Sequence, residues 1–301
     1  VQHHHAHIAA TLAEANEWGK VVGVALDGTG YGTDGALWGC EVLVCDQADF
    51  VRAAHLAYWP LPGGAAAVRK PARNALGLLH LCGLEDSEPA RRLLDGMGVE
   101  GPVVRQMMLR GLNCPPCGSA GRLFDAVAAL LGLVEAAGYE GEPACLLEAA
   151  ATRAPEDDGG EGEAQRYLLG LRPARPGENP AADDESLILD QTGMVRSVMD
   201  DIAAGVEPSV VARRFHEGFA DGIARAAIGV AHASGLSTVA LGGGVFANRL
   251  VLQRVALVLA HAGMRVLVPG SLPLNDGGIS YGQAAVARAR LARQGSPAPS
   301  A

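Results

Sequence analysis

Three short apolar segments, each followed by a loop rich in glycine or acidic residues, most constrain the fold of this chain. They are Val21–Leu26, Thr238–Leu241 and Met264–Val268. Continuous apolar runs of this length, bounded by turn residues, are typical of strands buried on both faces. A chain with several such strands must cover both faces of a sheet with helices, so the sequence predicts an α/β fold.

The spacing of the last two segments indicates how they connect. Helical patterns over 247–262 and 278–293 follow them, which predicts a βαβ unit with a parallel strand pair. Near the N-terminus, Ala36–Asp46 is a second strand that forms a hairpin with the first. Leu187–Asp190 is a further short strand. Other helices are expected at 1–19, 73–83, 87–96, 101–111, 122–137, 143–153, 194–204 and 208–234.

Composition narrows the class of function. The net charge of −9 argues against a nucleic-acid binder, which needs a basic face. No run of eighteen apolar residues is present, so we expect no membrane span. The six cysteines are scattered, as in cytoplasmic proteins with reduced thiols. Cys114 and Cys117 form a single CxxC pair, which we interpret as bystander thiols rather than zinc ligands.

The chain opens with the residues VQHHHAH. On a helix, His3 and His7 lie one turn apart on the same face. This spacing suits two imidazoles that bind one metal ion. An expression tag is the alternative, but Ala6 interrupts the histidines and the helical pattern continues beyond them. We therefore favour His3 and His7 as metal ligands.

Asp27 ends the first apolar segment and begins a glycine-rich turn. Gly28 and Gly30 let backbone N–H groups approach an anion closely, and Thr29 adds a hydroxyl. Asp27 is suited to hold a metal ion that bridges phosphates. The alternative is a plain β-hairpin turn, which an Asp-Gly pair also favours.

Two later loops also lie between a strand and a helix. Gly242-Gly243-Gly244, with Asn248 after it, would form an anion or nucleotide site at a helix N-terminus. This loop is neither a Walker A motif nor a Rossmann fingerprint. Asp276 would add a second carboxylate to a metal held by two histidines. A close-packed turn and a helix-capping aspartate are the alternatives.

A fifth motif, Gly121-Arg122-Leu123-Phe124-Asp125, begins an apolar helix. Arg122 could pair with a phosphate or a carboxylate, and Asp125 could bind ribose hydroxyls. Helix capping and charge balance are the alternatives. None of these motifs is specific when taken alone.

Their order along the chain is specific, because it resembles that of HypF-type carbamoyltransferases over roughly residues 1–290. The motifs that carry the resemblance are VQHHHAHIAA, DGTGYGTDGALWG, LPGG, GRLFDAVAALLGL, YEGEPACLLE, FHEGFADGI, LGGGVFANRL and PLNDGGISYGQA. The resemblance implies an ASKHA-type fold, like that of actin and Hsp70, with two α/β lobes and a nucleotide in the cleft. It implies one divalent metal, Fe, Zn or Mn, held by His3, His7, Asp27 and Asp276. It also implies that ATP or carbamoyl-adenylate contacts Gly28–Gly30, Gly121–Asp125 and Gly242–Asn248.

The implied reaction is transfer of the carbamoyl group of carbamoyl-adenylate, derived from carbamoyl phosphate, to the C-terminal cysteine of a HypE-like protein. This step belongs to cyanide-ligand synthesis for [NiFe] hydrogenases. Asp27, Asp276 and Arg122 would act at the reacting phosphate. The adenylate-forming step is assigned in this family to an upstream domain.

The resemblance also predicts the organisation of the chain. Residues 1–120 would form the first lobe, without its opening strands, 121–293 the second lobe, and 294–301 a disordered tail. The acidic segments 154–165 and 172–185 would be mobile loops. The chain departs from the family pattern at Gly242, Cys117-Gly118-Ser119 and Glu142, which affects details of the nucleotide contacts.

The alternatives are a TsaD-type or antibiotic-type O-carbamoyltransferase, a sugar kinase of the same fold, and a non-catalytic ATP-binding fragment. The sequence motifs QHHHAH and GRLFDAVAALLG favour the HypF type over the TsaD type. A kinase needs a carboxylate base but no histidine pair on a metal.

Overall fold

The computed structural model describes residues 1–155, 167–175, 178 and 186–295, and it has a mixed α/β fold. The α/β class expected from the sequence is confirmed. The strands are β1 (Val21–Tyr31), β2 (Leu37–Cys45), β3 (Phe50–Leu56), β4 (Trp59–Pro60), β5 (Pro116–Ser119), β6 (Gly170–Arg172), β7 (Leu187–Asp190), β8 (Thr238–Gly242) and β9 (Arg265–Leu267). The helices are α1 (His3–Glu14), α2 (Ala65–Arg69), α3 (Pro71–Leu81), α4 (Glu88–Gly96), α5 (Glu100–Arg110), α6 (Ala120–Leu130), α7 (Glu142–Thr152), α8 (Thr192–Ala203), α9 (Pro208–Ser234), α10 (Arg249–His261) and α11 (Ile279–Gly295), with 3-10 turns η1 (Gly244–Ala247) and η2 (Asp276–Gly278).

These strands form one sheet in the order β6-β7-β3-β2-β1-β8-β9, with β5 paired to β2 and β4. The expected hairpin is present as the antiparallel β1–β2 pair. The expected parallel pair is β8–β9, and β8 is also parallel to β1. Strands from both sides of residue 120 therefore share the sheet, so no boundary at that residue is visible in it. The division into lobes stays a prediction.

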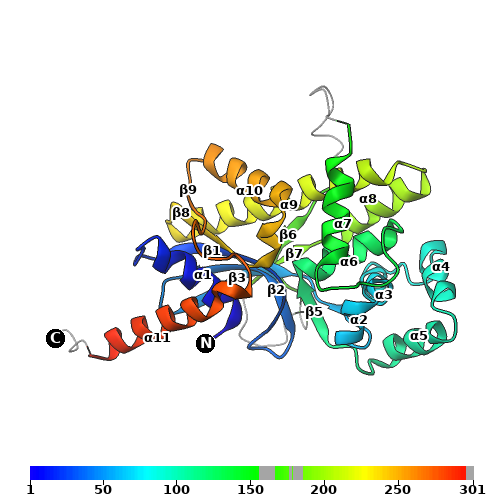
Figure 1. Ribbon diagram of the computed structural model, residues 1–301, viewed down its shortest axis with the longest axis horizontal. Coiled ribbons are helices and arrows are strands. Elements are labelled where there is room, and N and C mark those ends of the chain that lie inside the picture. Colours follow the sequence, from blue (N-terminus) through cyan, green and yellow to red (C-terminus); the bar gives the residue numbers. More distant parts are fainter. Residues whose placement is uncertain (156–166, 176–177, 179–185, 296–301) are drawn as a thin grey trace.

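Strand β1 is central and is buried on both faces. Val21 and Ala25 contact α1, whereas Val22, Val24 and Leu26 join the larger core that contains α6 and α9. Figure 1 shows α1 packed beside α11 near the N-terminus. The alternation explains why the segment is apolar at every position: each side chain meets a helix on one face or the other.

Two helices end earlier than expected because left-handed residues stop them. After α1, Asn16 has a φ of 51° and the Glu17 N–H donates to the Leu12 carbonyl at 2.8 Å. After α6, Gly132 has a φ of 69°. A left-handed residue after the last turn lets the following N–H bond back to the helix, which closes it.

Several elements were not anticipated, namely α2, β3, β4, β5 and β6. Strand β3 was missed because Arg52 and His55 interrupt its apolar pattern. The Arg52 guanidinium is balanced inside the sheet by Glu41, with Nε 2.6 Å from Oε2. The segment with Cys114 and Cys117 supplies β5, where burial raises the pKa of Cys117 to about 12.

The expected loops at 154–165 and 172–185 and the tail at 294–301 fall largely outside the described residues. Where they are described, Arg172 belongs to β6 and α11 continues through residues 294 and 295, so the expected loop and tail begin later than predicted. Among the described helices, none combines the length and apolar character needed to cross a membrane.

Candidate metal centre and adjoining cavity

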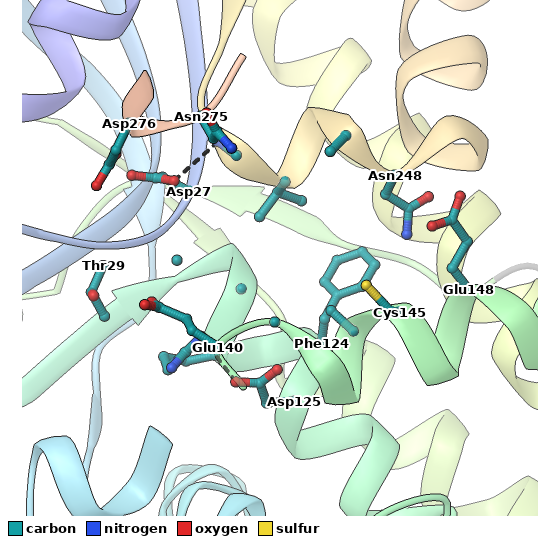
Figure 2. A pocket seen from close by; sticks show the side chains of 18 of the residues that line it. Asp27, Thr29, Phe124, Asp125, Glu140, Cys145, Glu148, Asn248, Asn275 and Asp276 are labelled. Carbon is teal, nitrogen blue, oxygen red and sulfur yellow. Dashed lines mark hydrogen bonds and ion pairs between the residues drawn. The ribbon is translucent and has the colours of Figure 1, made fainter. Parts of the chain in front are cut away.

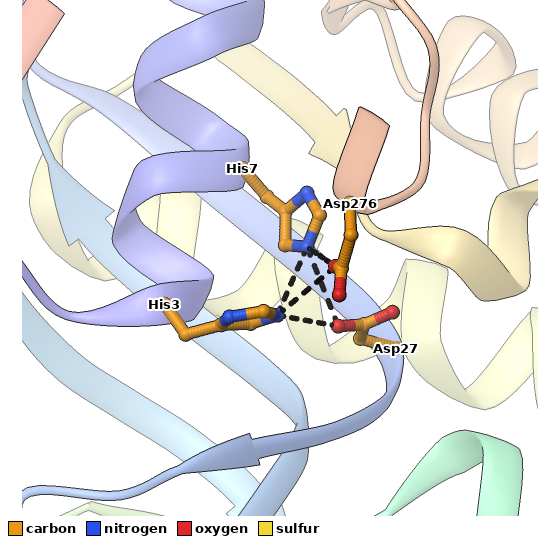
Figure 3. Close-up of side chains that lie close together, drawn as sticks. All are labelled: His3, His7, Asp27 and Asp276. Carbon is orange, nitrogen blue, oxygen red and sulfur yellow. Dashed lines mark hydrogen bonds and ion pairs between the residues drawn. The ribbon is translucent and has the colours of Figure 1, made fainter. Parts of the chain in front are cut away.

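Four side chains from three parts of the chain meet beside the end of the sheet. His3 and His7 come from α1, Asp27 from β1 and Asp276 from η2. Figure 3 shows the two imidazoles and the two carboxylates pointing toward a common centre. One ligating atom from each residue can be chosen so that all four lie within 4.8 Å of one another. The structure thus brings together the four residues that the sequence singled out.

Most separations of the donor atoms are close to those of ligands on a single cation, and the His3–Asp27 pair is closer, at a hydrogen-bond distance. His3 Nε2 lies 2.8 Å from Asp27 Oδ2, and His7 Nε2 lies 3.3 Å from the same oxygen. Both Nε2 atoms lie 3.3 Å from Asp276 Oδ1 and 3.2 Å from each other. Donors bonded tetrahedrally to one ion at about 2.0–2.2 Å stand roughly 3.3–3.6 Å apart. Two nitrogens and two carboxylates suit iron, zinc or manganese.

Local structure explains how α1 presents its histidines. The Gln2 side chain caps the helix by accepting from the His5 N–H at 2.9 Å. A Cβ at Gly30 would lie 2.6 Å from the His4 ring and 2.8 Å from the His3 ring. Gly30 is therefore a close-approach position under the histidines rather than a residue that lines the cavity.

Asp27 is held at both carboxylate oxygens. Oδ2 faces the histidines, and Oδ1 accepts from the Gly244 N–H at 3.0 Å. Burial opposes ionisation of Asp27, but the hydrogen bonds with His3 and His7 hold the pKa of that carboxyl well below its usual range. The hydrogen bond with Asp27 also raises the pKa of His3, against the effect of burial. The carboxylate is thus ionised and aimed at the centre.

A cavity of about 450 Å³ opens next to these residues (Figure 2). Its charged lining comprises five acidic side chains and one arginine. They are Asp27, Asp125, Glu140, Glu148, Asp276 and Arg122. Of the residues expected at the nucleotide, Gly28, Thr29, Gly121, Asp125, Gly244 and Asn248 line this cavity.

Gly242 and Gly243, in contrast, pack against the fold. A Cβ at Gly242 would lie 3.1 Å from the His7 carbonyl oxygen. Gly243 has a φ of 100°, and a Cβ there would lie 2.3 Å from the Leu26 carbonyl oxygen. Both glycines let β8 approach α1 and β1, and neither lines the cavity. Their predicted contact with nucleotide has no support in this arrangement.

Arg122 and Asp125 form a buried pair on α6. Arg122 Nη2 lies 3.0 Å from Asp125 Oδ2, and each side chain is 1% exposed. Burial raises the pKa of Asp125 to about 6, although Arg122 opposes this. Nε and Nη1 of Arg122 have no hydrogen-bond partner among the described residues. A buried guanidinium with unpaired donors beside a cavity is suited to bind an anionic ligand.

Ser119 joins this pair to Asp27. As the N-cap of α6, its Oγ accepts from the Arg122 N–H at 3.1 Å. The same hydroxyl lies 3.1 Å from the Asp27 carbonyl oxygen and also contacts the Gly28 carbonyl oxygen, so its one hydrogen can be donated to either of these neighbouring carbonyls. A Cβ at Gly121 would lie 2.8 Å from Gly28 Cα, so α6 is in direct contact with β1. The turn expected directly after Asp27 is not present, because β1 continues through Gly28 to Tyr31 with an irregularity in its pairing to β2 between Leu26 and Gly30.

Sequence reasoning did not single out several residues that line the cavity. They are Glu140, Gly141, Cys145, Glu148 and Asn275. Four of them belong to the motif YEGEPACLLE, which contributed to the family resemblance but received no role. Its position at the start of α7 was predictable, whereas the packing of α7 over α6 was not.

Comparisons with known proteins point to one family. The family model described as "Carbamoyltransferase, Kae1-like Domain, second subdomain" matches residues 23–283. A carbamoyltransferase HypF homolog of Cupriavidus necator is 38% identical over 291 residues, which cover 95% of this chain and 70% of that protein. Carbamoyltransferase HypF of Rhodobacter capsulatus is 39% identical and covers 97% of this chain, which spans only 36% of it.

A solved structure shows the same fold. It is the crystal structure of full-length HypF in the phosphate- and nucleotide-bound form, with a TM-score of 0.84 and 35% identity over 97% of this chain and 43% of that chain. The family model, the two relatives and the solved structure place this chain in the HypF family of carbamoyltransferases.

Proposed function

We propose that this chain passes the carbamoyl group of carbamoyl-adenylate to the C-terminal cysteine of a HypE-like protein. The supporting observation is the convergence of His3, His7, Asp27 and Asp276 at one end of a cavity that also contains Arg122. We further propose an ASKHA-type fold, a cytoplasmic location, and a small-molecule substrate with a protein acceptor rather than nucleic acid. The net charge of −9 supports the last point.

In this proposal the phosphate of the adenylate lies at the metal end of the cavity. A divalent ion at the four donors would supply positive charge to the phosphate and stabilise the departing AMP. The unpaired N–H groups of Arg122 would bind the same phosphate, and the Asp125 beside it would bind the ribose. Gly28 and Gly244 line this end, where the absence of side chains leaves room for the phosphate.

The transfer step needs little acid–base help from the chain. The acceptor thiolate attacks the carbamoyl carbon, a C–S bond forms, and the C–O bond to the phosphate breaks. AMP leaves with the bonding electron pair. Because a thiolate is already a strong nucleophile, positioning and charge stabilisation carry the reaction.

The test is transfer of a radiolabelled carbamoyl group from carbamoyl-adenylate to a peptide that ends in the HypE-like cysteine. We expect His3→Ala and His7→Ala of the full chain to lower the transfer rate at least about 10-fold, because each removes a metal ligand. His261→Ala, at the exposed end of α10, is the matched control and should transfer normally.

Two outcomes would contradict the proposal. Unchanged transfer in both His3→Ala and His7→Ala would exclude a role for the metal centre. Failure of the wild-type chain to transfer would exclude the acceptor or the half-reaction, whatever the metal content.

A further inference from the structure

His216 is a buried histidine that contacts two residues lining the cavity, Phe124 and Asn248. His216 on α9 is 1% exposed, and its ring packs edge-on to Phe124 with centroids 5.1 Å apart. Its Nδ1 lies 2.7 Å from the Ala212 carbonyl oxygen, and its Nε2 lies 2.9 Å from Asn248 Nδ2. His216 itself does not line the cavity, but Asn248 does.

These contacts determine which nitrogen of His216 carries the proton. A carbonyl oxygen only accepts, so Nδ1 must be protonated and donate to Ala212. Nε2 of a neutral imidazole is then an acceptor. Burial lowers the pKa of His216 to about 4, in keeping with a neutral ring. The amide nitrogen of Asn248 therefore donates to Nε2.

Two hydrogen bonds fix the orientation of the Asn248 amide. Its Oδ1 accepts from the Val251 N–H at 3.1 Å and caps α10, while its Nδ2 donates to His216. A flipped amide would place oxygen against the Nε2 lone pair and nitrogen against the Val251 N–H, losing both bonds. One N–H of the amide remains for a ligand.

The position of Asn248 indicates which part of a nucleotide it would meet. Figure 2 shows Asn248 at the opposite end of the cavity from Asp27 and Asp276. Between the two ends, Phe124 and Cys145 contribute to the lining. With phosphate at the metal end, the base of the nucleotide extends toward Asn248, where apolar atoms can pack on its ring.

We propose that His216 is a positioning residue that holds the Asn248 amide with an N–H donor directed at a ring nitrogen of the bound purine. The inference rests on the proposed function, because it assumes that the phosphates lie at the metal centre. A fixed donor recognises an acceptor and disfavours a base edge that presents a hydrogen there. His216 thus contributes to base recognition without touching the ligand.

The experiment is calorimetric titration of the full chain with ATP and with its 1-deaza, 3-deaza and 7-deaza analogues. Each analogue replaces one ring nitrogen by C–H. We expect one analogue to bind wild-type protein about 3- to 10-fold more weakly than ATP, as the loss of one hydrogen bond implies. His216→Leu should bind ATP more weakly and should no longer distinguish that analogue from ATP.

Two further variants separate positioning from general damage. His216→Gln carries a carbonyl that can accept from Asn248, and it should restore discrimination between ATP and the analogue. Asn248→Asp keeps the cap on α10 but removes the donor, so it should lose discrimination even if His216→Leu does not fold. Metal content should stay unchanged in all three variants, because neither residue belongs to the metal cluster.

The outcomes are distinct. Wild-type protein that binds no nucleotide contradicts the proposed function. Wild-type protein that binds ATP and all three deaza analogues equally contradicts the inference alone. Discrimination that persists in His216→Leu or Asn248→Asp also overturns it.

Discussion

At the scale of residues, Asp27 connects the two halves of the site. One carboxylate oxygen faces the histidines of α1 and the other accepts from the backbone of Gly244. A single side chain therefore ties the metal centre to the glycine loop after β8. The sequence could predict that Asp27 and Asp276 carry function from their places after strands. It could not predict the Gly244 contact, because 217 positions separate the two residues.

The titration of Asp125 gives a prediction at this scale. Its pKa in the folded protein is about 6, above the ordinary value of 3.8, because burial disfavours the charged form. The folded state thus binds the proton more tightly, and the resulting stabilisation is complete below about pH 4. It is lost as pH rises through about 6, by at most about 1.4 kcal/mol per pH unit.

Asp125→Asn should remove this contribution. Urea unfolding of wild type and of Asp125→Asn between pH 4 and pH 7 checks this prediction, because it gives the pH dependence of the free energy of unfolding for each protein. The same slope in wild type and Asp125→Asn would show that Asp125 does not titrate in this range.

At the scale of elements, the contact between α1 and α11 orders the metal centre. The two helices approach so closely that a Cβ at Gly282 would lie 1.9 Å from the Ala6 carbonyl oxygen. Helix α11 begins directly after η2, which carries Asp276. The sequence predicted both helices, because each has a clear periodic pattern. Their contact depends on tertiary packing, which periodicity does not encode.

Gly282→Ala is expected to separate α1 from α11. The added methyl group would meet backbone atoms, so we expect a loss of about 1–3 kcal/mol in the free energy of unfolding and weaker metal retention. Gly229→Ala is the control, because a Cβ at this helical glycine on α9 would meet no atom within 4 Å beyond its chain neighbours and the backbone of its own helix. It should stabilise the protein by up to about 1 kcal/mol. Thermal unfolding and metal analysis of Gly282→Ala and Gly229→Ala check this prediction. Equal stability and equal metal content in the two variants would show that the close contact between α1 and α11 does not matter.

At the scale of the whole molecule, the site depends on long-range folding. Its four candidate metal ligands lie at positions 3, 7, 27 and 276, and the parallel pairing of β1 with β8 brings the two ends of the chain together. The sequence predicted the strands at both ends and the β8–β9 pair. It did not predict that β1 lies beside β8, nor β3 and β5, whose charged residues and prolines mask the strand pattern.

Metal removal should therefore weaken the fold as a whole. An ion that binds only the folded state stabilises it by about 2.7 kcal/mol at 100 times its Kd. We expect a chelator to lower the thermal midpoint of wild-type protein by several degrees. The midpoint of Asp276→Asn should hardly change, because this variant lacks one of the four candidate metal ligands. Asp95→Asn, on exposed α4, should respond like wild type. The account would be wrong if wild type and Asp276→Asn responded alike.

The most direct measurement is anomalous X-ray scattering from crystals of the full chain, recorded at the iron, zinc and manganese absorption edges. The account predicts one peak within bonding distance of the imidazole nitrogens of His3 and His7 and of the carboxylates of Asp27 and Asp276. A metal peak bound elsewhere, or these four side chains ordered with no peak between them, would contradict it.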